Sequence, residues 1–545
     1  MSNEDKILLR KTLRYIKIYR KKIYFLLFFL ILTIILSMLQ PLLVGSIIQN
    51  ISEQKFEIIN NNILLLLFIY ILQGGINSFK SYLEIKLNND IIYNIKKNLY
   101  VKILNFKMKE FNNLTIGELI SRLEGDVNLI AYSFTNHILN MFINIIKMFI
   151  ICILIFNINI YMAIFITIIF PFVYYLFLII GKKIKYQSIQ LKKLNDRYFS
   201  FIQQTFNNIK YIKSLGMKNQ NINKFSQLAL NFKFKQIKVS MINVLVKNGI
   251  VILNCINTII LIFLGVYSIK NKIISIKNFI VIMSYASQFY QCLTELSEIN
   301  TIFHQMLVSI ERVFSIIDNV DFEEEKFGII TKDSISGKIK FENIFFKYNN
   351  KTILENFNLT IREKSITVIT GNNGSGKSTI FNLILKLYNP QGGRILVDDL
   401  DIENFDEYTL RKNISILDQQ PMVFKGSIRE NFKYICPSIS NIEIESICKK
   451  VFIHNYIINL KEGYDTSVSE CGKNLSGGQK QLLSLAMCLC KNTKIILLDE
   501  PTSALDAKIK ELFNKIMIDI GKDKTLLIIT HDSSLLEIAD NIVSL

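Results

Sequence analysis

Tryptophan is absent from this 545-residue chain, and its eight cysteines are scattered. Three of them, Cys152, Cys255 and Cys292, lie in long apolar runs, whereas Cys488 and Cys490 stand too close together for a zinc-binding pair. Neither the ligand spacing of a metal site nor the framework of a disulfide-stapled domain is present. We therefore expect the cysteines to be small core residues in a reducing compartment.

Outside the membrane half, the chain also lacks a basic stripe interleaved with aromatic residues, the pattern typical of nucleic-acid-binding surfaces. Its formal net charge is nevertheless +19, and half of all residues are apolar. Lysine and arginine concentrate beside the apolar runs. This pattern indicates a cytoplasmic membrane face that meets anionic lipid, so we expect a lipid bilayer and no nucleic acid among the partners.

A signal-peptide cleavage site is missing as well. Residues 1–22 carry eight Lys and Arg and lead into an apolar run, but no small-residue cleavage site follows. We expect this run to be a membrane-spanning helix, Ile23–Ile48, with a kink at Pro41. Further apolar segments predict six spans in all, the others being Ile58–Leu83, Ile138–Phe156, Tyr161–Ile180, Met241–Ile269 and Phe279–Cys292.

The connections between these spans predict the orientation. Segments 84–136 and 182–240 are long, polar and rich in lysine, while the other connections are short. The positive-inside rule then places the N-terminus, both long segments and the C-terminal half in the cytoplasm, as in a multi-pass protein of the cytoplasmic membrane. Apolar residues recur every three to four positions in Leu99–Phe111 and Leu191–Leu215, which predicts helices with a short break that continue beyond the bilayer.

Polar residues inside the spans form three stripes at helical spacing. Polar groups are expensive in lipid, so one-sided polar faces suggest helices that line a wet cavity, with Lys147, Asn144, Lys247 and Glu295 as candidate cargo contacts. The alternative is that Lys247, Glu295 and Glu298 snorkel to the interface and that the asparagines only hydrogen-bond between helices. The stripes are His137, Asn140, Asn144 and Lys147; Asn243, Lys247, Asn254 and Asn257; and Ser284, Gln288, Gln291, Glu295 and Glu298.

The character of the sequence changes near residue 318. An acidic stretch without long apolar runs follows, and we interpret residues 319–336 as a linker between a transmembrane domain, 1–318, and a second domain, 337–545. Beyond it, short apolar strands such as Ile414–Leu417, Ile495–Leu498 and Leu526–Ile529 alternate with helical stretches. This alternation predicts an α/β domain with a largely parallel sheet.

One segment of the second domain fits a phosphate-binding loop. It follows an apolar strand, Ile366–Ile369, and precedes a helix-like segment, Ile380–Lys386. Its glycines let successive backbone N–H groups point at phosphate oxygens, Lys377 would reach the β- and γ-phosphates, and Ser378 would bind Mg²⁺. The alternative is a Gly/Ser-rich surface turn. The loop is Gly371, Asn372, Asn373, Gly374, Ser375, Gly376, Lys377, Ser378 and Thr379.

Two adjacent carboxylates end a second apolar strand, Ile495–Leu498. The carboxyl edge of an open α/β sheet is where its ligands bind. Asp499 is therefore a candidate Mg²⁺ ligand, and Glu500 a candidate general base for an attacking water. A further segment, Leu475–Gln479, opens a helix after a glycine-containing loop. Ser476 could simply cap that helix, or the segment could offer backbone N–H groups to a second phosphate.

The order of these motifs resembles the ATP-binding cassette of ABC transporters, and the six spans resemble an exporter-type membrane domain on the same chain. The resemblance implies roles for further residues. Tyr348 resembles the aromatic residue that stacks on adenine, and Gln419 the glutamine that senses Mg²⁺ and the γ-phosphate. His531 resembles the switch histidine, and Asp506 the aspartate at the dimer seam. Ser476, Gly477, Gly478 and Gln479 belong to a segment like the signature motif that contacts ATP held by the opposite subunit.

The resemblance extends to two membrane-domain segments, Thr115–Leu119 and Asn207–Gly216, which resemble the cytoplasmic turns that dock on the cassette. The chain departs from the family pattern at Gln420, where glutamate is common, and its usual C-terminal strand looks cut short at Leu545. These departures leave nucleotide binding as expected.

We therefore expect an ATP-driven exporter with ATP and Mg²⁺ as cofactors. It would work by alternating access as a homodimer or with a related half-transporter, and it would carry a peptide or a hydrophobic compound. The alternative is a membrane-embedded sensor or regulator that uses the cassette as a nucleotide switch without moving cargo.

Overall fold

The computed structural model describes residues 15, 17–318, 322–349, 351–372, 374–469 and 472–545. Within helices, the side chains of 169–170, 172–174, 176–185, 243, 297–301 and 304 lie outside the description. The chain forms two units, Met1–Phe106 with Glu110–Glu324, and Lys107–Lys109 with Glu325–Leu545. The expected linker, residues 319–336, includes the division between them.

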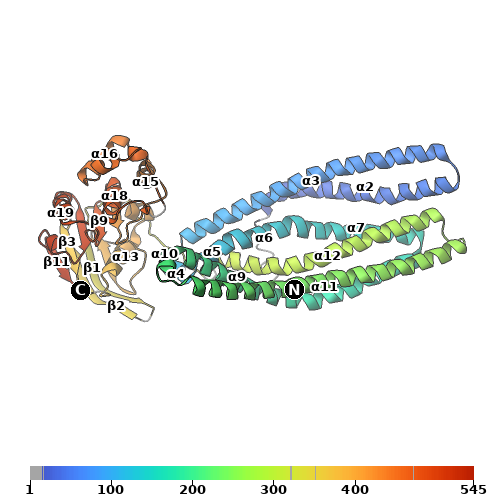
Figure 1. Ribbon diagram of the computed structural model, residues 1–545, viewed down its shortest axis with the longest axis horizontal. Helices are drawn as coiled ribbons and strands as arrows, with labels where there is room; N and C mark the ends of the chain where they lie inside the picture. Colours follow the sequence, from blue (N-terminus) through green and yellow to red (C-terminus); the bar gives the residue numbers. More distant parts are fainter. Residues whose placement is uncertain (1–14, 16, 319–321, 350, 373, 470–471) are drawn as a thin grey trace. The chain divides into compact units, whose positions relative to one another are not determined.

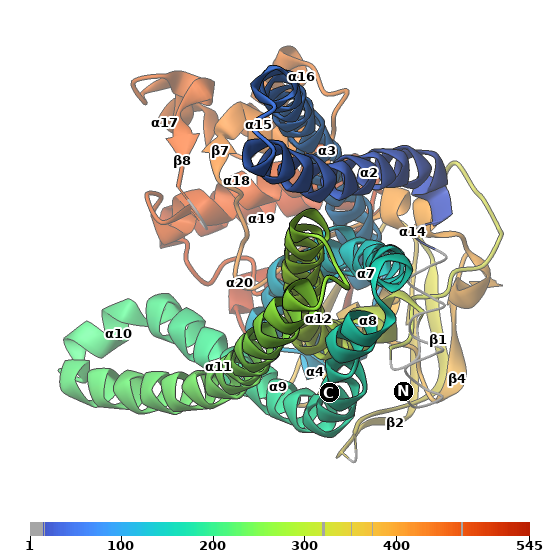
Figure 2. The same ribbon diagram turned by 90° about the vertical axis from the view of Figure 1, so that its right-hand side faces the viewer.

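The first unit is a bundle of long helices (Figures 1 and 2). The central helix is α12, which packs against α2, α7, α9 and α11. Short segments interrupt the long helices after Leu104 and after Asn207, as the sequence predicts. The helices are η1 (Lys17–Tyr19), α2 (Arg20–Ser52), α3 (Phe56–Leu104), α4 (Met108–Asn113), α5 (Ile116–Ile120), α6 (Val127–Tyr132), α7 (Leu139–Ile158), α8 (Ile160–Thr167), α9 (Ile169–Asn207), α10 (Ile209–Ser214), α11 (Lys218–Lys270) and α12 (Ile276–Ile317).

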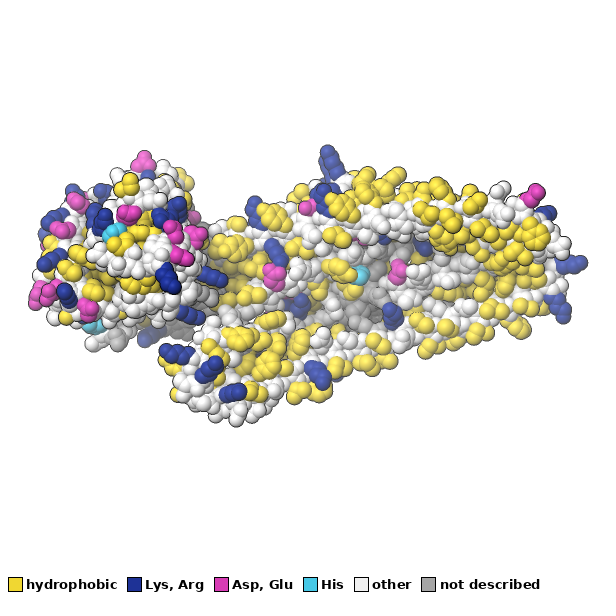
Figure 3. Space-filling model, turned by 45° about the horizontal axis from the view of Figure 1, so that its top comes forward, with side chains coloured by type: hydrophobic (Ala, Val, Ile, Leu, Met, Phe, Trp, Pro, Cys, Tyr) yellow, Lys and Arg dark blue, Asp and Glu magenta, His cyan; other side chains and the backbone are white. Residues whose placement is uncertain are grey.

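The outer surface of this bundle is apolar. Hydrophobic side chains cover much of its length in Figure 3, where few charges interrupt them. Four helical stretches among the described residues are long and apolar enough to cross a membrane: Lys17–Ser52, Phe56–Leu104, Ile116–Ile158 and Lys218–Lys270. The other two expected spans lie in α8–α9 and α12. The prediction of six spans is consistent with this arrangement.

Helix α2 continues through Pro41, which has no N–H to offer the carbonyl of Ser37. Gln288 of α12 supplies the missing donor, with its Nε2 3.2 Å from that carbonyl oxygen. Tyr285, one turn earlier, donates its hydroxyl to the carbonyl of Met38 at 2.8 Å. A buried backbone carbonyl without a partner is costly, so these bonds stabilise the α2–α12 contact. Gln288, expected in a cavity stripe, is thus engaged in joining helices.

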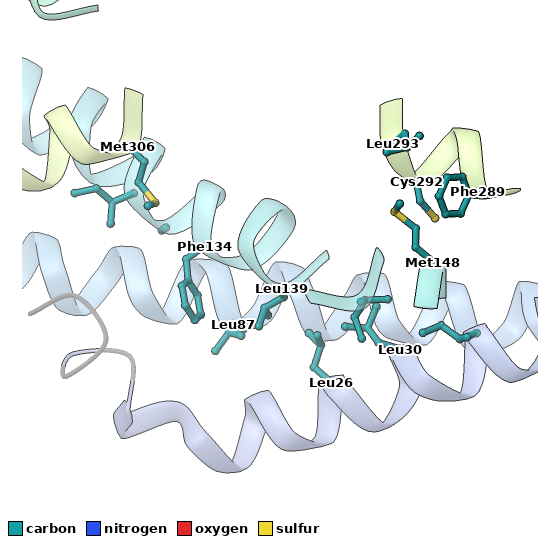
Figure 4. Close-up of a cluster of buried hydrophobic side chains, with 14 of the residues drawn as sticks. Leu26, Leu30, Leu87, Phe134, Leu139, Met148, Phe289, Cys292, Leu293 and Met306 are labelled. Atoms are coloured by element: carbon teal, nitrogen blue, oxygen red, sulfur yellow. The ribbon is translucent and has the colours of Figure 1, made fainter. Parts of the chain in front are cut away.

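The interior of the bundle is a continuous apolar core, to which α2, α3, α7, α8, α11 and α12 contribute buried side chains. In Figure 4, Met148 of α7 lies beside Cys292 and Phe289 of α12, while Leu26 and Leu30 of α2 lie on the side facing Leu139. In lipid, such close packing holds helices together because the hydrophobic effect between helices is weak there.

Two π-helical segments, η2 (Ser121–Asp126) and η3 (Ser133–Ile138), flank α6. Asp126, at the end of η2, is fully buried. Its carboxylate lies 2.5 Å from Lys192 Nζ of α9, accepts a 2.8 Å hydrogen bond from Ser309 of α12, and lies 3.4 Å from Arg312 Nε. Arg312 also contacts Asp196 of α9 at 2.9 Å. This buried ionic network joins three helices.

The second unit contains a parallel five-stranded sheet in the order β11-β3-β10-β9-β6. A separate four-stranded antiparallel sheet, β2-β1-β4-β5, adds to the largely parallel sheet that the sequence predicts. The strands are β1 (Ile339–Tyr348), β2 (Lys351–Ile361), β3 (Ile366–Thr370), β4 (Gly392–Val397), β5 (Leu400–Asp401), β6 (Ile414–Leu417), β7 (Gly426–Ser427), β8 (Ser467–Val468), β9 (Ile495–Asp499), β10 (Thr525–Ile529) and β11 (Asn541–Ser544).

Alternate residues of the parallel strands enter two different cores. Leu498 and Ile528 pack in one core with α18, whereas Leu497 and Leu527 pack in the other with the antiparallel sheet. Burial on both faces explains the apolar runs of the central strands β9 and β10. The helices of this unit are η4 (Ile402–Asn404), α13 (Lys377–Ile384), α14 (Glu407–Asn413), α15 (Ile428–Ile435), α16 (Asn441–Lys450), α17 (His454–Ile458), η5 (Gly463–Asp465), α18 (Gly477–Cys490), α19 (Ala507–Gly521) and α20 (Ser533–Leu536).

The C-terminal strand is present, contrary to the expectation from its short sequence. β11 pairs in parallel with β3 over Asn541–Ser544, and the amide of Leu545 donates to the carbonyl of Thr370. Four residues suffice because β11 is an edge strand with one neighbour.

Candidate functional site

The phosphate loop connects β3 to α13. Gly371, Gly374 and Gly376 have φ angles of 145°, 83° and 101°, which side chains rarely adopt. Lys377 is 9% exposed, and its Nζ donates to the carbonyls of Gly371 at 2.5 Å and Asn372 at 3.0 Å. The ammonium therefore lies against the loop in which a phosphate group would bind. Asn373 lies outside the described residues.

One polar atom in this loop is left over. Among the described residues, the Ser375 hydroxyl is buried without a hydrogen-bond partner. Such orphaned groups are rare in folded proteins, and a ligand oxygen is one way to satisfy them. Together with the glycine conformations and the buried lysine, this donor fits a phosphate chain.

Asp499, at the carboxyl end of β9, faces the first turn of α13. Its Oδ2 accepts a 3.1 Å hydrogen bond from the hydroxyl of Ser378. Burial raises the pKa of Asp499, and the bond from Ser378 offsets part of that rise. A hydroxyl and a carboxylate in contact are the oxygen donors that Mg²⁺ prefers, so these residues fit the expected metal.

Glu500 follows directly, with a φ of 46° that is unusual for a non-glycine residue. Its Oε1 lies 3.9 Å from His531 Nε2. Burial raises the pKa of Glu500, and the neighbouring His531 opposes the rise. His531 Nε2 also lies 3.3 Å from Lys377 Nζ, so the imidazole stands between the Glu500 carboxylate and the Lys377 ammonium. Such a group is suited to proton transfer and charge stabilisation.

These residues line one cavity of ≈ 360 Å³. Tyr348 forms part of its wall, where its hydroxyl accepts a hydrogen bond from Asn382 at 3.2 Å and its ring makes T-shaped contacts with Phe346 and Tyr388. Gln419, just beyond β6, also reaches the cavity. The lining is Tyr348, Lys351, Ile353, Gly374, Gly376, Lys377, Ser378, Thr379, Gln419, Asp499, Glu500, Ile529 and His531.

The remaining predicted ATP contacts lie away from that lining. Ser476 caps α18 by accepting from the Gln479 amide at 3.3 Å, while Gln479 Oε1 accepts from the Ser476 amide at 2.9 Å. The sequence-based interpretation of Ser476 as a helix cap is confirmed. Asp506 caps α19 through a 2.8 Å bond from the Ile509 amide. Gly477 and Gly478 open α18 beside Ser476.

Gln481 is a further residue near the site, and it belongs to none of the motifs described above. This side chain is 2% exposed on α18 and bonds to the backbone of Glu500 and of Ala504. Its signal is weak, because Gln481 follows the polar Gln479 and Lys480 and directly precedes the buried run Leu482–Cys488. A buried carboxamide needs hydrogen-bond partners, but the sequence does not identify them.

The membrane unit has its own polar cavity, of ≈ 490 Å³. Asn144 of α7 donates to Glu295 Oε2 of α12 at 2.8 Å, and Gln291 donates to Glu295 Oε1 at 3.1 Å. Carboxamides from several helices complete the wall. The lining is Leu30, Thr33, Ile34, Ser37, Gln73, Asn77, Lys80, Asn136, His137, Asn140, Ile143, Asn144, Lys147, Gln291, Cys292 and Glu295.

The polar stripe from His137 to Lys147 thus lines the cavity, whereas no described residue of the stripe from Asn243 to Asn257 does. Lys147 lines it, whereas Lys247 lies exposed on α11, a helix that contributes no residue to the lining. Asn257, from the same stripe as Lys247, is 4% exposed and donates to the carbonyl of Phe165 at 3.0 Å. Interhelical bonding, the alternative for this stripe, explains Asn257. The side chains of Asn243 and Glu298 lie outside the described residues.

Comparison with known families gives two matches. Residues 23–293 match the family described as the ABC transporter transmembrane region, and residues 354–503 match the one described as ABC transporter. The matches cover the helical bundle and the cassette in the order in which they occur. The second match contains both the phosphate loop and Asp499-Glu500.

Individual proteins resemble the chain over nearly its whole length. It is 29% identical to an ATP-dependent lipid A-core flippase of Syntrophus aciditrophicus over 88% of the chain and 80% of that protein. It is 27% identical to an uncharacterized ABC transporter ATP-binding protein of Bacillus subtilis over 98% of the chain and 89% of that protein. A solved bacterial Atm1-family ABC exporter with ATP bound shares the fold, with a TM-score of 0.86, 20% identity and coverage of 97% and 94%.

Proposed function

Because the chain belongs to the ABC transporter family, as a half-transporter that fuses an exporter-type membrane domain to an ATP-binding cassette, we propose that two copies close on two ATP molecules and export cargo by alternating access. The protein is a multi-pass membrane protein that binds and hydrolyses ATP. Binding of ATP would favour the closed cassette pair, and hydrolysis would return the membrane helices to their starting state.

The observation that carries this proposal is the incomplete ATP site of a single cassette. One chain gathers Tyr348, the phosphate loop and Glu500 around a cavity, but the capped start of α18 at Ser476 lies outside its lining. Exposed N–H groups at a helix start suit a phosphate. A second copy, or a related half-transporter, would bring its own Ser476–Gln479 to this cavity.

The residues of the cavity divide the chemistry between them. Mg²⁺, held by Ser378, Asp499 and Gln419, would supply positive charge to the phosphate oxygens. The Lys377 ammonium would donate to phosphate oxygens in place of the carbonyls of Gly371 and Asn372. Glu500 would accept the proton of the attacking water, and His531 would hold the charge that develops opposite Lys377.

The cavity of the membrane unit is the proposed cargo site. Its carboxamides offer donors and acceptors together, and Lys147 and Glu295 offer charges of both signs beside apolar Leu30 and Ile143. This mixture suits a peptide or a hydrophobic compound that carries polar groups. The lysine-rich segments support a cytoplasmic cassette, with export away from the side where ATP is available.

Reconstitution into proteoliposomes tests the proposal. ATP added with Mg²⁺ should be hydrolysed and should drive uptake of a labelled peptide or a fluorescent hydrophobic compound from a small panel. Lys377→Ala should abolish both activities, while Lys522→Ala, at an exposed lysine on the same cassette, should keep them. Hydrolysis that depends on Lys377 without movement of any panel member would favour a nucleotide-switched regulator.

A further inference from the structure

The Gln481 carboxamide is fully engaged with the turn that follows β9. Its Nε2 donates to the carbonyl oxygen of Glu500 at 3.1 Å, and its Oε1 accepts from the amide of Ala504 at 3.2 Å. Both partners are backbone atoms, so the bonds constrain the path of the chain and not one side-chain rotamer. Gln481 belongs to α18, a helix that packs in one core with β9 and β10 of the parallel sheet.

The turn needs this support because of Glu500. A non-glycine residue at a φ of 46° persists only where its surroundings hold it. The Glu500 amide donates to the carbonyl of Ile529 on β10 at 2.8 Å, and its carbonyl also accepts from the Ser503 amide at 3.3 Å. Gln481 provides the bond that attaches this strained residue to α18.

Close packing joins the same two segments. A Cβ atom on Gly477 would lie 3.2 Å from the Cβ of Ala504, and one on Gly478 would lie 3.2 Å from the Ala504 carbonyl oxygen. The start of α18 therefore approaches the turn as closely as glycine allows. Two residues after Ala504, Asp506 caps α19. Gln481 bonds from one turn further along α18 and completes the attachment.

We propose that Gln481 is a positioning residue that fixes Glu500 and couples it to the start of α18. The inference rests on the proposed function, in which Glu500 acts on the ATP of its own cassette and Ser476–Gln479 meet the ATP of the second copy. Gln481 thus links two parts of the same cassette: Ser476–Gln479, which contact the ATP bound by the second copy, and Glu500, the general base for the ATP of its own cassette. Hydrolysis at either site then depends on Gln481, whereas ATP binding does not.

Steady-state hydrolysis by the full-length protein in proteoliposomes tests this role. Gln481→Met keeps the length of the side chain and removes both bonds, and it should lower kcat about tenfold while leaving the KM for ATP within about twofold. Gln481→Glu keeps an acceptor for Ala504 but loses the donor to Glu500, and its kcat should also fall. Asn413→Leu is the matched control, since it removes another buried carboxamide of the cassette, bonded to the Thr409 carbonyl at 2.9 Å.

The outcomes are separable. Hydrolysis by Gln481→Met within about twofold of the unsubstituted rate would overturn the inference, as would an equal loss of kcat in Asn413→Leu. A rise in KM at unchanged kcat would also overturn it, because that result assigns Gln481 to binding. If Gln481→Met fails to fold, Gln481→Glu gives the same reading. Absence of hydrolysis in the unsubstituted protein would instead refute the proposed function.

Discussion

The hydroxyl of Ser378 and the carboxylate of Asp499 are joined directly, across 3.1 Å, between the first turn of α13 and the end of β9. Two oxygens this close define the place where a divalent cation would sit between helix and strand. Because the bond is local, it needs neither the membrane unit nor a second copy. We therefore expect the Mg²⁺ requirement to be a property of the single cassette.

We predict that Ser378→Ala raises the Mg²⁺ concentration needed for half-maximal hydrolysis by about tenfold or more, because one of the oxygen ligands is lost. Chelation of Mg²⁺ should stop hydrolysis by the unsubstituted protein. Titration of the hydrolysis rate with Mg²⁺ at fixed ATP measures the effect. Ser365→Ala, which removes a hydroxyl bonded to the Arg362 carbonyl at 2.7 Å, should leave the titration unchanged. An unaltered Mg²⁺ requirement in Ser378→Ala would exclude its role as a ligand.

Glu500→Gln should bind ATP and lose most turnover. The amide is nearly isosteric with the carboxylate but accepts no proton, so kcat should fall by about 100-fold or more. Single-turnover hydrolysis and binding of a labelled nucleotide measure the two properties separately. Glu511→Gln, at an exposed position on α19, is the control. Near-normal hydrolysis by Glu500→Gln would show that another group takes the proton.

The buried network around Asp126 should matter for stability more than any exposed ion pair. Asp126→Ala leaves Lys192 and Arg312 facing each other without their shared carboxylate, and we expect a loss of about 3 to 5 kcal/mol in the free energy of unfolding. Thermal unfolding of the detergent-solubilised protein checks this. Glu53→Ala, which breaks the exposed contact with Lys55, should not shift the midpoint. Equal midpoints for the two variants would contradict the prediction.

Lys147 should select cargo by charge. Lys147→Met removes an ammonium from the wall of the membrane cavity, so the KM for an anionic cargo should rise by more than that for a neutral cargo of the same size. Transport assays with a pair of matched peptides, acidic and neutral, measure the ratio. Lys247→Met, outside the lining, should leave the ratio unchanged. If both variants change it equally, surface charge and not the cavity is responsible.

Much of the cassette could be predicted from sequence because its signals are local. The expected strand Ile414–Leu417 coincides with β6, and the expected Ile495–Leu498 falls one residue short of β9. The placement of Asp499 and Glu500 in the site could also be predicted, because parallel strands bring their carboxyl ends to one edge of the sheet. The antiparallel sheet was missed because β1 changes register three times along β2 and once along β4, which weakens its alternation.

The membrane unit was less predictable because its polar residues depend on neighbours distant in sequence. Spacing alone does not show that Asn257 bonds to Phe165 while Asn144 bonds to Glu295. Asp126 was not recognised because its three cationic and polar partners lie 66 or more residues away. The two π-helical segments have no signature in a period of 3.6 residues.

The π-helical segments η2 and η3 affect how side chains at one end of the helical stretch Ile116–Ile158 are rotated about its axis relative to those at the other end. A π-helical turn contains one residue more than an α-helical turn, and each α-helical residue turns the helix by about 100°. Because η3 lies between Asp126 and Asn144, it sets the rotation of one side chain relative to the other. Deleting one residue from Ser133–Ile138 would restore regular α-helix without breaking the chain. The deletion would also rotate Asp126 relative to Asn144. The shortened helix could then place either Asp126 in the ionic network or Asn144 in the cavity wall, but not both.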